Sequence, residues 1–230
     1  MPSLNNATRS FIPISLGNHF YSKSVLRFVK EQVIDQSHDS KVVICDYLRC
    51  LNYQMRGVAA GKGLCMKVEL EADQFRRTLN NAGISNSDCT IVTMTRILKT
   101  PGFKEILVKL SDYASSIDVE PTLKQLACDY LYRFNIATND VKLVDLQKLY
   151  LIYEAALCIH ITESLGYTTE VYRIEDMVFT RYLYTHHERF LCSIVAKRSL
   201  ERQFLSIETM IDEWDRGQKQ ASQFKTEFPS

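Results

Sequence analysis

The chain has 230 residues, of which 46% are hydrophobic and 24% are charged. This composition is typical of a globular protein with a sizeable core, and it excludes a disordered tail, a collagen-like fibre and a small disulfide scaffold. The 28 Lys and Arg residues nearly balance the 27 Asp and Glu residues. Any contact with nucleic acid must therefore come from local basic patches rather than from net charge.

No segment of the sequence has the features of a membrane anchor or a secretion signal. No uncharged apolar run reaches the roughly 18 residues that a membrane helix needs, and the N-terminal segment MPSLNNATRSF lacks the apolar core of a signal peptide. The seven cysteines form no CxxC pair, which favours free thiols over a zinc site. We predict a cytoplasmic, metal-free protein with a single domain over 1–230 and flexible ends at 1–9 and about 217–230.

Strands and helices alternate over the first hundred residues. Apolar and β-branched runs predict three strands, at 11–15, 41–46 and 90–95. Helical patterns follow Ser22, a plausible cap, and cover about 66–80. This alternation predicts an α/β, Rossmann-like fold with a mostly parallel sheet flanked by helices. In such sheets the ligand binds beyond the carboxyl ends of the strands, so the strand exits are the segments to examine for function.

The second half of the chain is mostly helical by pattern. Helices are expected at about 102–116 and 120–135, and the longest periodic segment runs from Asp140 to Leu165 before the helix stop at Gly166. A fourth strand is expected at 170–173 and a further helix at 200–216.

A serine stands at the exit of the first predicted strand. The segment Pro13-Ile14-Ser15-Leu16-Gly17 would present the hydroxyl of Ser15 on a tight turn, where backbone N–H groups would hold an oxyanion. It matches half of the hydrolase elbow G-x-S-x-G, with Pro13 in place of the first glycine. The alternative is a serine that only caps a turn.

A second candidate group lies on the long predicted helix. Tyr150 and Glu154 are four residues apart and share one face of an otherwise apolar segment, KLYLIYEAALCI. A carboxylate on such a face is costly to bury without a partner. That partner is either a cation such as a substrate ammonium group or an internal Arg or Lys.

Several of these segments together resemble a known family. In chain order they are ISLGNHFYS at 14–22, ICDYL at 44–48, LNY at 51–53, YLIYE at 150–154, GY at 166–167 and EVY at 170–172. The ordered set, over roughly 11–175, resembles the tRNA-dependent cyclodipeptide synthases. The resemblance implies a Rossmann-like fold similar to the catalytic domain of class I aminoacyl-tRNA synthetases.

The activity that the resemblance implies is the joining of two amino acids from two aminoacyl-tRNAs into a cyclic dipeptide. Ser15 would be the nucleophile that forms an aminoacyl-enzyme and then a dipeptidyl-enzyme, and Glu154 with Tyr150 would hold the ammonium group. Because the substrates arrive as activated esters, no cofactor is expected. We expect the chain to act as a monomer.

The resemblance also implies further site residues. A tyrosine that relays protons would be Tyr182, with Tyr184 as the alternative, and Asn18 matches the asparagine after the nucleophile turn. The chain departs from the family pattern at Pro13, at Leu183 and at Ala155-Ala156. The pocket for the first amino acid would be apolar and lined by Phe11, Pro13, Leu157 and Leu98.

Basic side chains for tRNA are expected in two stretches. They are Lys67, Arg76 and Arg77 in the first and Lys197 and Arg198 in the second. These patches are modest, so we expect weak, salt-sensitive binding.

Two other functions compete with the synthase. A serine hydrolase would need a histidine base for Ser15, and His186 or His187 would have to supply it. A non-catalytic relative would bind aminoacyl-tRNA without forming an acyl-enzyme, and the departures from the family pattern keep that alternative open.

Overall fold

The structure, a computed structural model, describes residues 8–17, 19–173, 177–194 and 203–216. Its centre is a sheet of five parallel strands in the order β3-β2-β1-β4-β5. The strands are β1 Arg9–Ile14, β2 Asp39–Ile44, β3 Thr90–Thr93, β4 Thr169–Tyr172 and β5 Gln203–Ser206. The predicted α/β class with a parallel sheet is confirmed.

Four of the five strands lie close to the predicted segments, and the fifth does not. The helix expected over 200–216 is wrong at its start, because Gln203–Ser206 pairs with β4 and the described helix covers only 207–216. Pairing with an existing strand outweighs local helical preference in so short a segment. Ordered structure also starts earlier than expected, since Arg9 of the predicted flexible end pairs with Asp39 in the sheet.

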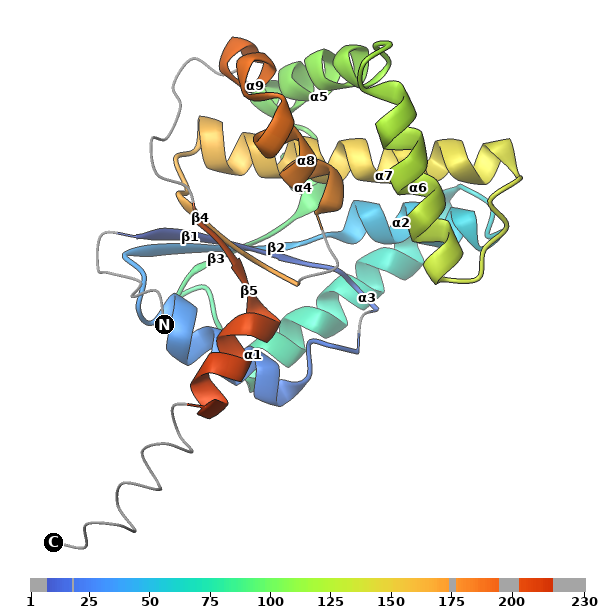
Figure 1. Cartoon of the computed structure of the whole chain (residues 1–230). Helices are drawn as coiled ribbons and strands as arrows, with labels where there is room; N and C mark the ends of the chain where they lie inside the picture. Colours follow the sequence, from blue (N-terminus) through green and yellow to red (C-terminus); the bar gives the residue numbers. More distant parts are fainter. Residues whose placement is uncertain (1–7, 18, 174–176, 195–202, 217–230) are drawn as a thin grey trace, which may run out of the picture.

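Both faces of the sheet are covered by helices (Figure 1). One layer consists of α1 Lys23–Val29, α3 Lys62–Asn81 and the helix at 207–216. The other layer consists of α2 Asp46–Met55, α4 Met94–Ile97, α5 Pro101–Ala114, α6 Glu120–Arg133, α7 Val141–Ile159, α8 Val178–His186 and α9 Glu188–Ile194. Alternate side chains of β1 supply the two cores, with Phe11 in one and Ile12 in the other. Because both faces of the central strands are buried, β1 and β2 contain the continuous apolar runs FIPI and VVI.

Helix α7 is the central element of its layer, packed against α2, α5, α6 and α8. Its start is fixed by Asp140, whose side chain accepts hydrogen bonds from the N–H groups of Lys142 and Leu143. Every residue from Glu154 to Ile159 is buried, and the helix continues as a π-helical turn, His160–Ser164, before Gly166 at φ 74°. The long helix predicted for this region is therefore confirmed.

Helix α2 was not predicted, although it follows β2 directly. Its residues Leu48, Leu51 and Met55 are buried at helical spacing, so the sequence does carry an amphipathic helical pattern here. The predicted cap at Ser22 is confirmed, because its hydroxyl accepts from the N–H of Val25 at the start of α1.

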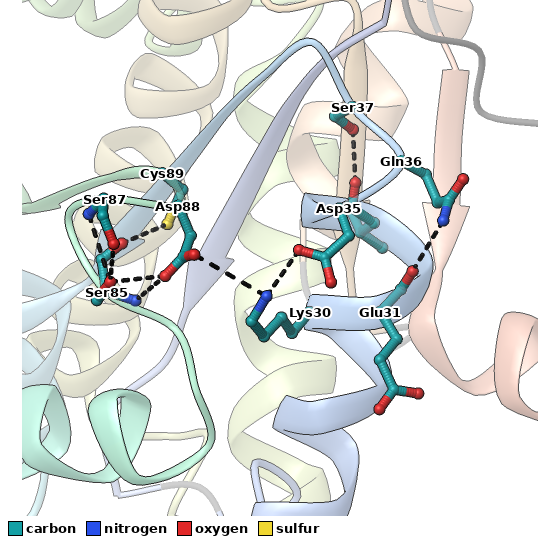
Figure 2. A network of polar contacts seen from close by, with 10 residues as sticks. Lys30, Glu31, Asp35, Gln36, Ser37, Ser85, Ser87, Asp88 and Cys89 are labelled. Carbon is teal, nitrogen blue, oxygen red and sulfur yellow. Dashed lines mark hydrogen bonds and ion pairs between the residues drawn. The ribbon is translucent and has the colours of Figure 1, made fainter.

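A polar network fastens the π-helical turn after α1, Lys30–Ile34, to the loop before β3 (Figure 2). The Lys30 ammonium lies 2.7 Å from an Asp35 carboxylate oxygen and 4.0 Å from one of Asp88. Asp88 in turn accepts from the backbone N–H and the hydroxyl of Ser85. These residues precede β2 and β3, so the network lies at the amino end of the parallel sheet, opposite the exit of β1.

All seven cysteines are free thiols, as expected. Among the described helices, none combines the length and the hydropathy needed to cross a lipid bilayer.

Candidate active site

The strand order reverses between β1 and β4, and Ser15 and Arg173 directly follow these two strands. Both residues line one pocket of about 230 Å³. Open parallel sheets bind their ligands at this kind of switch point, beyond the carboxyl ends of the strands. The predicted exit of β1 is therefore part of a formed cavity.

The pocket is built from the turn after β1 and from three helices. The turn contributes Ser15, Leu16 and Gly17, with His19 just beyond. The helices and the segment after α6 contribute Arg49, Asn52, Met55, Arg56, Tyr130, Phe134, Ile136, Gln147 and Tyr150. The sequence predicted that Ser15 and Tyr150 belong to one active site, and in the structure both residues line the same pocket.

The turn that carries Ser15 is held against Arg49 of α2. Gly17 has φ 75°, and a Cβ atom there would lie 2.4 Å from the Arg49 guanidinium carbon. Arg49 Nε donates to Glu71 Oε2 at 2.9 Å, and its Nη2 donates to the Tyr53 hydroxyl at 3.2 Å. The Tyr53 hydroxyl also donates to Glu71. A glycine is required at residue 17 both by its backbone conformation and by the guanidinium packed against it.

Tyr150 forms part of an aromatic wall. It is buried, with a relative exposure of 2%, and its ring centroid lies 5.9 Å from that of Tyr130. The ring centroids of Tyr130 and Phe134 are 4.9 Å apart. The wall offers an aromatic, largely apolar surface to the body of a ligand.

Glu154 has a hydrogen-bond partner that is neither a substrate cation nor an internal Arg or Lys, the two alternatives that the sequence left open. Its Oε2 accepts a hydrogen bond from the backbone N–H of Met177 at 3.1 Å. Met177 immediately precedes α8, so the carboxylate lies at the N-terminus of a helix, where the helix dipole favours negative charge. Glu154 lies two turns of α7 beyond Gln147, on the same face, and is not among the described residues that line the pocket.

The pocket lining is positively charged. Arg49, Arg56 and Arg173 line it together with His19, and no carboxylate is among its described lining residues. Arg49 is paired with Glu71, whereas Arg56 is exposed at the end of α2. Such a lining attracts an anionic ligand. In the described part of the chain no three His, Cys, Asp or Glu residues are grouped to hold a metal ion.

The residues predicted for the first amino acid lie in or near the core. Phe11 and Leu157 are completely buried, and Leu98 is partly buried at the end of α4. Pro13 is buried in β1, and its carbonyl accepts a hydrogen bond from the Tyr21 hydroxyl at 3.1 Å. These four residues do not line the pocket that contains Ser15, and their role stays a prediction.

Neither candidate relay tyrosine lines this pocket. Tyr182 stacks on Phe179 and approaches His187, with ring centroids 6.2 and 4.8 Å away. The Tyr184 hydroxyl donates to a Glu163 carboxylate oxygen at 3.4 Å. A proton-relay role for Tyr182 or Tyr184 stays a prediction.

The predicted tRNA-binding cations are only partly described. Lys67 lies on α3 with its ammonium 4.1 Å from the Tyr53 ring centroid, Arg77 is exposed, and Arg76 pairs with Asp73 at 3.1 Å. α3 packs against α2, which lines the pocket. Asn18, Lys197 and Arg198 lie outside the described residues.

Sequence reasoning missed Gln147, Arg49, Arg56 and Arg173. Gln147 had a signal, because it lies three residues before Tyr150 and seven before Glu154 on one helical face. Arg173 also had one, since it is the last residue of the strand predicted at 170–173. Arg49 and Arg56 lie at the exit of the second predicted strand, one of the segments expected to bind the ligand, but no helix was predicted there.

No protein-family model and no curated protein matches the sequence significantly, whereas solved structures do match. AlbC, a cyclodipeptide synthase from Streptomyces noursei, has a TM-score of 0.63 and 14% identity, covering 90% of this chain and 99% of its own. A cyclodipeptide synthase (CDPS) from Fluoribacter dumoffii has a TM-score of 0.66 and 16% identity, covering 86% and 88%.

A third similar structure is that of a Mycobacterium tuberculosis protein, which demonstrates that cyclodipeptide synthetases are related to type I tRNA synthetases. Its TM-score is 0.61 at 13% identity, covering 87% of this chain and 84% of that protein. At such identities the likeness concerns the fold. The chain therefore has the fold of the cyclodipeptide synthases, and the predicted Rossmann-like fold is confirmed.

Proposed function

We propose that the protein is an aminoacyltransferase that joins amino acids from two aminoacyl-tRNAs into a cyclic dipeptide. The observation that carries the proposal is the pocket at the switch point, which Ser15 and Tyr150 line together with three arginines and with no carboxylate among its described lining residues. A nucleophile in a positively charged pocket suits an ester whose leaving group is a nucleic acid. The shared fold with cyclodipeptide synthases supports the same activity.

The first step is acyl transfer to Ser15. Its Oγ attacks the ester carbonyl of an aminoacyl-tRNA, a new ester bond forms, and the bond to the tRNA ribose breaks. The serine proton goes to the ribose oxygen that leaves. Backbone N–H groups of the turn at 15–17 would hold the oxyanion of the tetrahedral intermediate.

The second step forms the first peptide bond. The amino group of the seryl-bound amino acid attacks the ester carbonyl of a second aminoacyl-tRNA, an amide bond forms, and the bond to the second tRNA ribose breaks, with the amine proton going to the ribose oxygen that leaves. In the ping-pong scheme that we favour, the dipeptide is carried by Ser15 after release of both tRNAs. Its free amino group then attacks the seryl ester carbonyl, closes the six-membered ring and regenerates the serine hydroxyl.

Tyr150 and Glu154 are assigned to the ammonium group of the bound amino acid. Tyr150 lines the pocket, and Glu154 lies one further turn along α7 on the same face. A buried carboxylate attracts a cation strongly because the surrounding dielectric is low. The substrates are already activated esters, so the scheme needs no ATP, metal or cofactor, and we propose that a monomer carries it out.

The hydrolase alternative has less support in the geometry. The nearest histidine in sequence, His19, is exposed on the pocket lining, and no hydrogen bond between it and Ser15 is found among the described residues. His187 instead bonds through Nδ1 to the Tyr113 hydroxyl at 2.7 Å. A hydrolase needs a base held by an acid.

The proposal is tested by mass spectrometry of medium from bacteria that express the chain. We expect cyclic dipeptides with the wild type and none with Ser15→Ala, while Ser24→Ala, an exposed serine in α1, leaves them unchanged. Intact-mass measurement after mixing with aminoacyl-tRNA should detect an aminoacyl adduct that Ser15→Ala lacks. A soluble wild type that binds aminoacyl-tRNA without an adduct would indicate a non-catalytic relative. Labelling of Ser15 by a fluorophosphonate together with tRNA-independent ester cleavage would indicate a hydrolase.

A further inference from the structure

Gln147 of α7 is a completely buried amide on the wall of the pocket that contains Ser15. It has 0% of its surface exposed and is one of the residues that line the cavity. Neither Nε2 nor Oε1 has a hydrogen-bond partner among the described residues. Because burial removes the amide from water, this arrangement is unfavourable for folding alone. The position on a pocket wall points to a ligand as the partner.

Gln147 lies at a distance along α7 from Glu154, the residue to which we assign the ammonium group of the substrate. The two residues are seven positions apart on one face of α7, which corresponds to about 10 Å along the helix axis. Tyr150 lies between them. We assign the α-amino group to Glu154 and Tyr150, and we infer that Gln147 contacts a different part of the substrates.

The surroundings of Gln147 favour a neutral polar group. The wall beside it carries Tyr130, Phe134 and Ile136, which suit the apolar body of an amino-acid side chain. A charged group placed against a buried neutral amide would lose its hydration and gain no opposite charge from that amide, and a cationic group would also meet the arginines of the same lining. An amide offers one acceptor and two donor hydrogens, which pair well with a hydroxyl or another carboxamide.

We propose that Gln147 determines the specificity of the synthase for one of its two amino acids. It selects an uncharged side chain that ends in a hydroxyl or a carboxamide, and it does so by hydrogen bonding at the enclosed part of the pocket. The inference rests on the proposed synthase activity and adds the chemical class of one substrate. Sites built to hydrogen-bond a polar group discriminate strongly, because the wrong ligand leaves their buried groups unpaired.

The test replaces Gln147 by methionine, which is similar in length and lacks the amide. Gln125→Met is the control, because Gln125 is exposed on α6 and bonds only to Asp129 among the described residues. Products are compared by mass spectrometry of culture medium, and thermal unfolding is measured on the purified chains. We expect wild-type products that contain a hydroxyl or carboxamide residue. In Gln147→Met the ratio of these to wholly apolar products should fall at least ~10-fold, at an unchanged or higher melting temperature.

Two outcomes would overturn the inference without contradicting the proposed synthase activity. One is a Ser15-dependent set of wholly apolar products that Gln147→Met does not alter. The other is a melting temperature that falls by several degrees in Gln147→Met but not in Gln125→Met, which would make the amide a structural group. If the wild type makes no cyclic dipeptide at all, the proposed function fails and this inference fails with it.

Discussion

The carboxylate of Glu154 accepts a hydrogen bond from the backbone N–H of Met177, with 3.1 Å between Oε2 and the nitrogen. Met177 has φ 66°, a left-handed conformation that is unfavourable for a residue with a side chain. It directly precedes α8, so the hydrogen bond fixes the backbone where that helix begins. Glu154 therefore has a structural role in addition to the one that we propose in substrate binding.

The two roles of Glu154 are separable by substitution. In Glu154→Gln the amide oxygen still accepts from Met177, so we expect a stable fold but a loss of the charge that holds the ammonium group. Glu154→Ala removes both the hydrogen-bond acceptor and the charge. We expect the free energy of unfolding to fall by about 1–3 kcal/mol, because the backbone N–H of Met177 loses its partner. Urea unfolding measures the stability, and the yield of seryl adduct measures the function. Both variants should lose at least ~100-fold in adduct formation; wild-type yield in Glu154→Gln would remove the substrate role.

Gly17→Ala should disturb the nucleophile turn. The left-handed φ of 75° costs a residue with a side chain about 1 kcal/mol, and the new Cβ would overlap the guanidinium of Arg49. We expect a stability loss of about 1–2 kcal/mol and at least a ~10-fold loss of acyl transfer, since Ser15 shifts with the turn. Gly63→Ala is the control, because no described atom lies within 4 Å of its Cβ position and the residue is helical.

The contribution of the guanidinium is measured by a double-mutant cycle. If the overlap with Arg49 causes part of the loss, Gly17→Ala should cost less in an Arg49→Ala background, with an interaction of about 0.5 kcal/mol or more. Strict additivity would instead attribute the whole effect to the backbone conformation.

The fold was largely predictable because two strong patterns carry it. β1 and β2 stand out through the apolar runs FIPI and VVI, β3 and β4 through their β-branched and aromatic residues, and α7 through its long apolar segment. β5, with the sequence QFLS, could not be found in this way, because it has no β-branched residue and is defined by its pairing with β4. Helix α2 has a helical pattern in Leu48, Leu51 and Met55, which the prediction did not use.

The candidate site was predictable only at its chemically distinctive members. Ser15 at a strand exit and Tyr150 on a helical face have positional signals, and both line the pocket. The Met177 partner of Glu154 is a backbone group, which no sequence pattern marks. Gln147 shares a helical face with Tyr150 and Glu154, but its burial without a partner among the described residues is decided by tertiary packing.

Asp39 should make stability depend on pH at the end of the sheet opposite Ser15. Burial acts to raise the pKa of Asp39, but hydrogen bonds from Arg9 and Tyr167 outweigh it and hold that pKa below its ordinary value. A lowered folded-state pKa gives stability that is present above the unfolded pKa of about 3.9 and is lost as pH falls through the folded value. The carboxylate should therefore stabilise the fold at neutral pH and cease to do so in acid.

The measurement compares urea unfolding of the wild type and Asp39→Asn at pH 7 and pH 3. Because both partners are about one-third exposed, solvent screening limits the expected difference at pH 7 to about 1 kcal/mol. That difference should shrink toward zero at pH 3, while Asp112→Asn, at an exposed residue of α5, shows little difference at either pH. A difference of the same size at both pH values would contradict the ionic contribution. The Asp39→Asn variant should still form cyclic dipeptides at neutral pH.

Arg56 is expected to contact the phosphate backbone of the tRNA. It is exposed at the end of α2 and lines the pocket that contains Ser15, so a 3′ end that delivers its ester there would pass close to it. Replacing a cation by a neutral side chain removes about one counterion released on binding, and the slope of log affinity against log salt should become less steep by about 0.7 for single-stranded RNA.

We therefore expect Arg56→Gln to raise KM for aminoacyl-tRNA roughly 3–10-fold at low salt, with kcat nearly unchanged, because the lost contact acts equally on ground and transition states. Arg27→Gln is the matched control, since Arg27 is exposed on α1, across the sheet from α2. Initial rates at several tRNA and salt concentrations give both quantities. An equal effect of the two substitutions would mean that tRNA responds to overall charge rather than to this pocket, and a fall in kcat alone would place Arg56 in the chemical step.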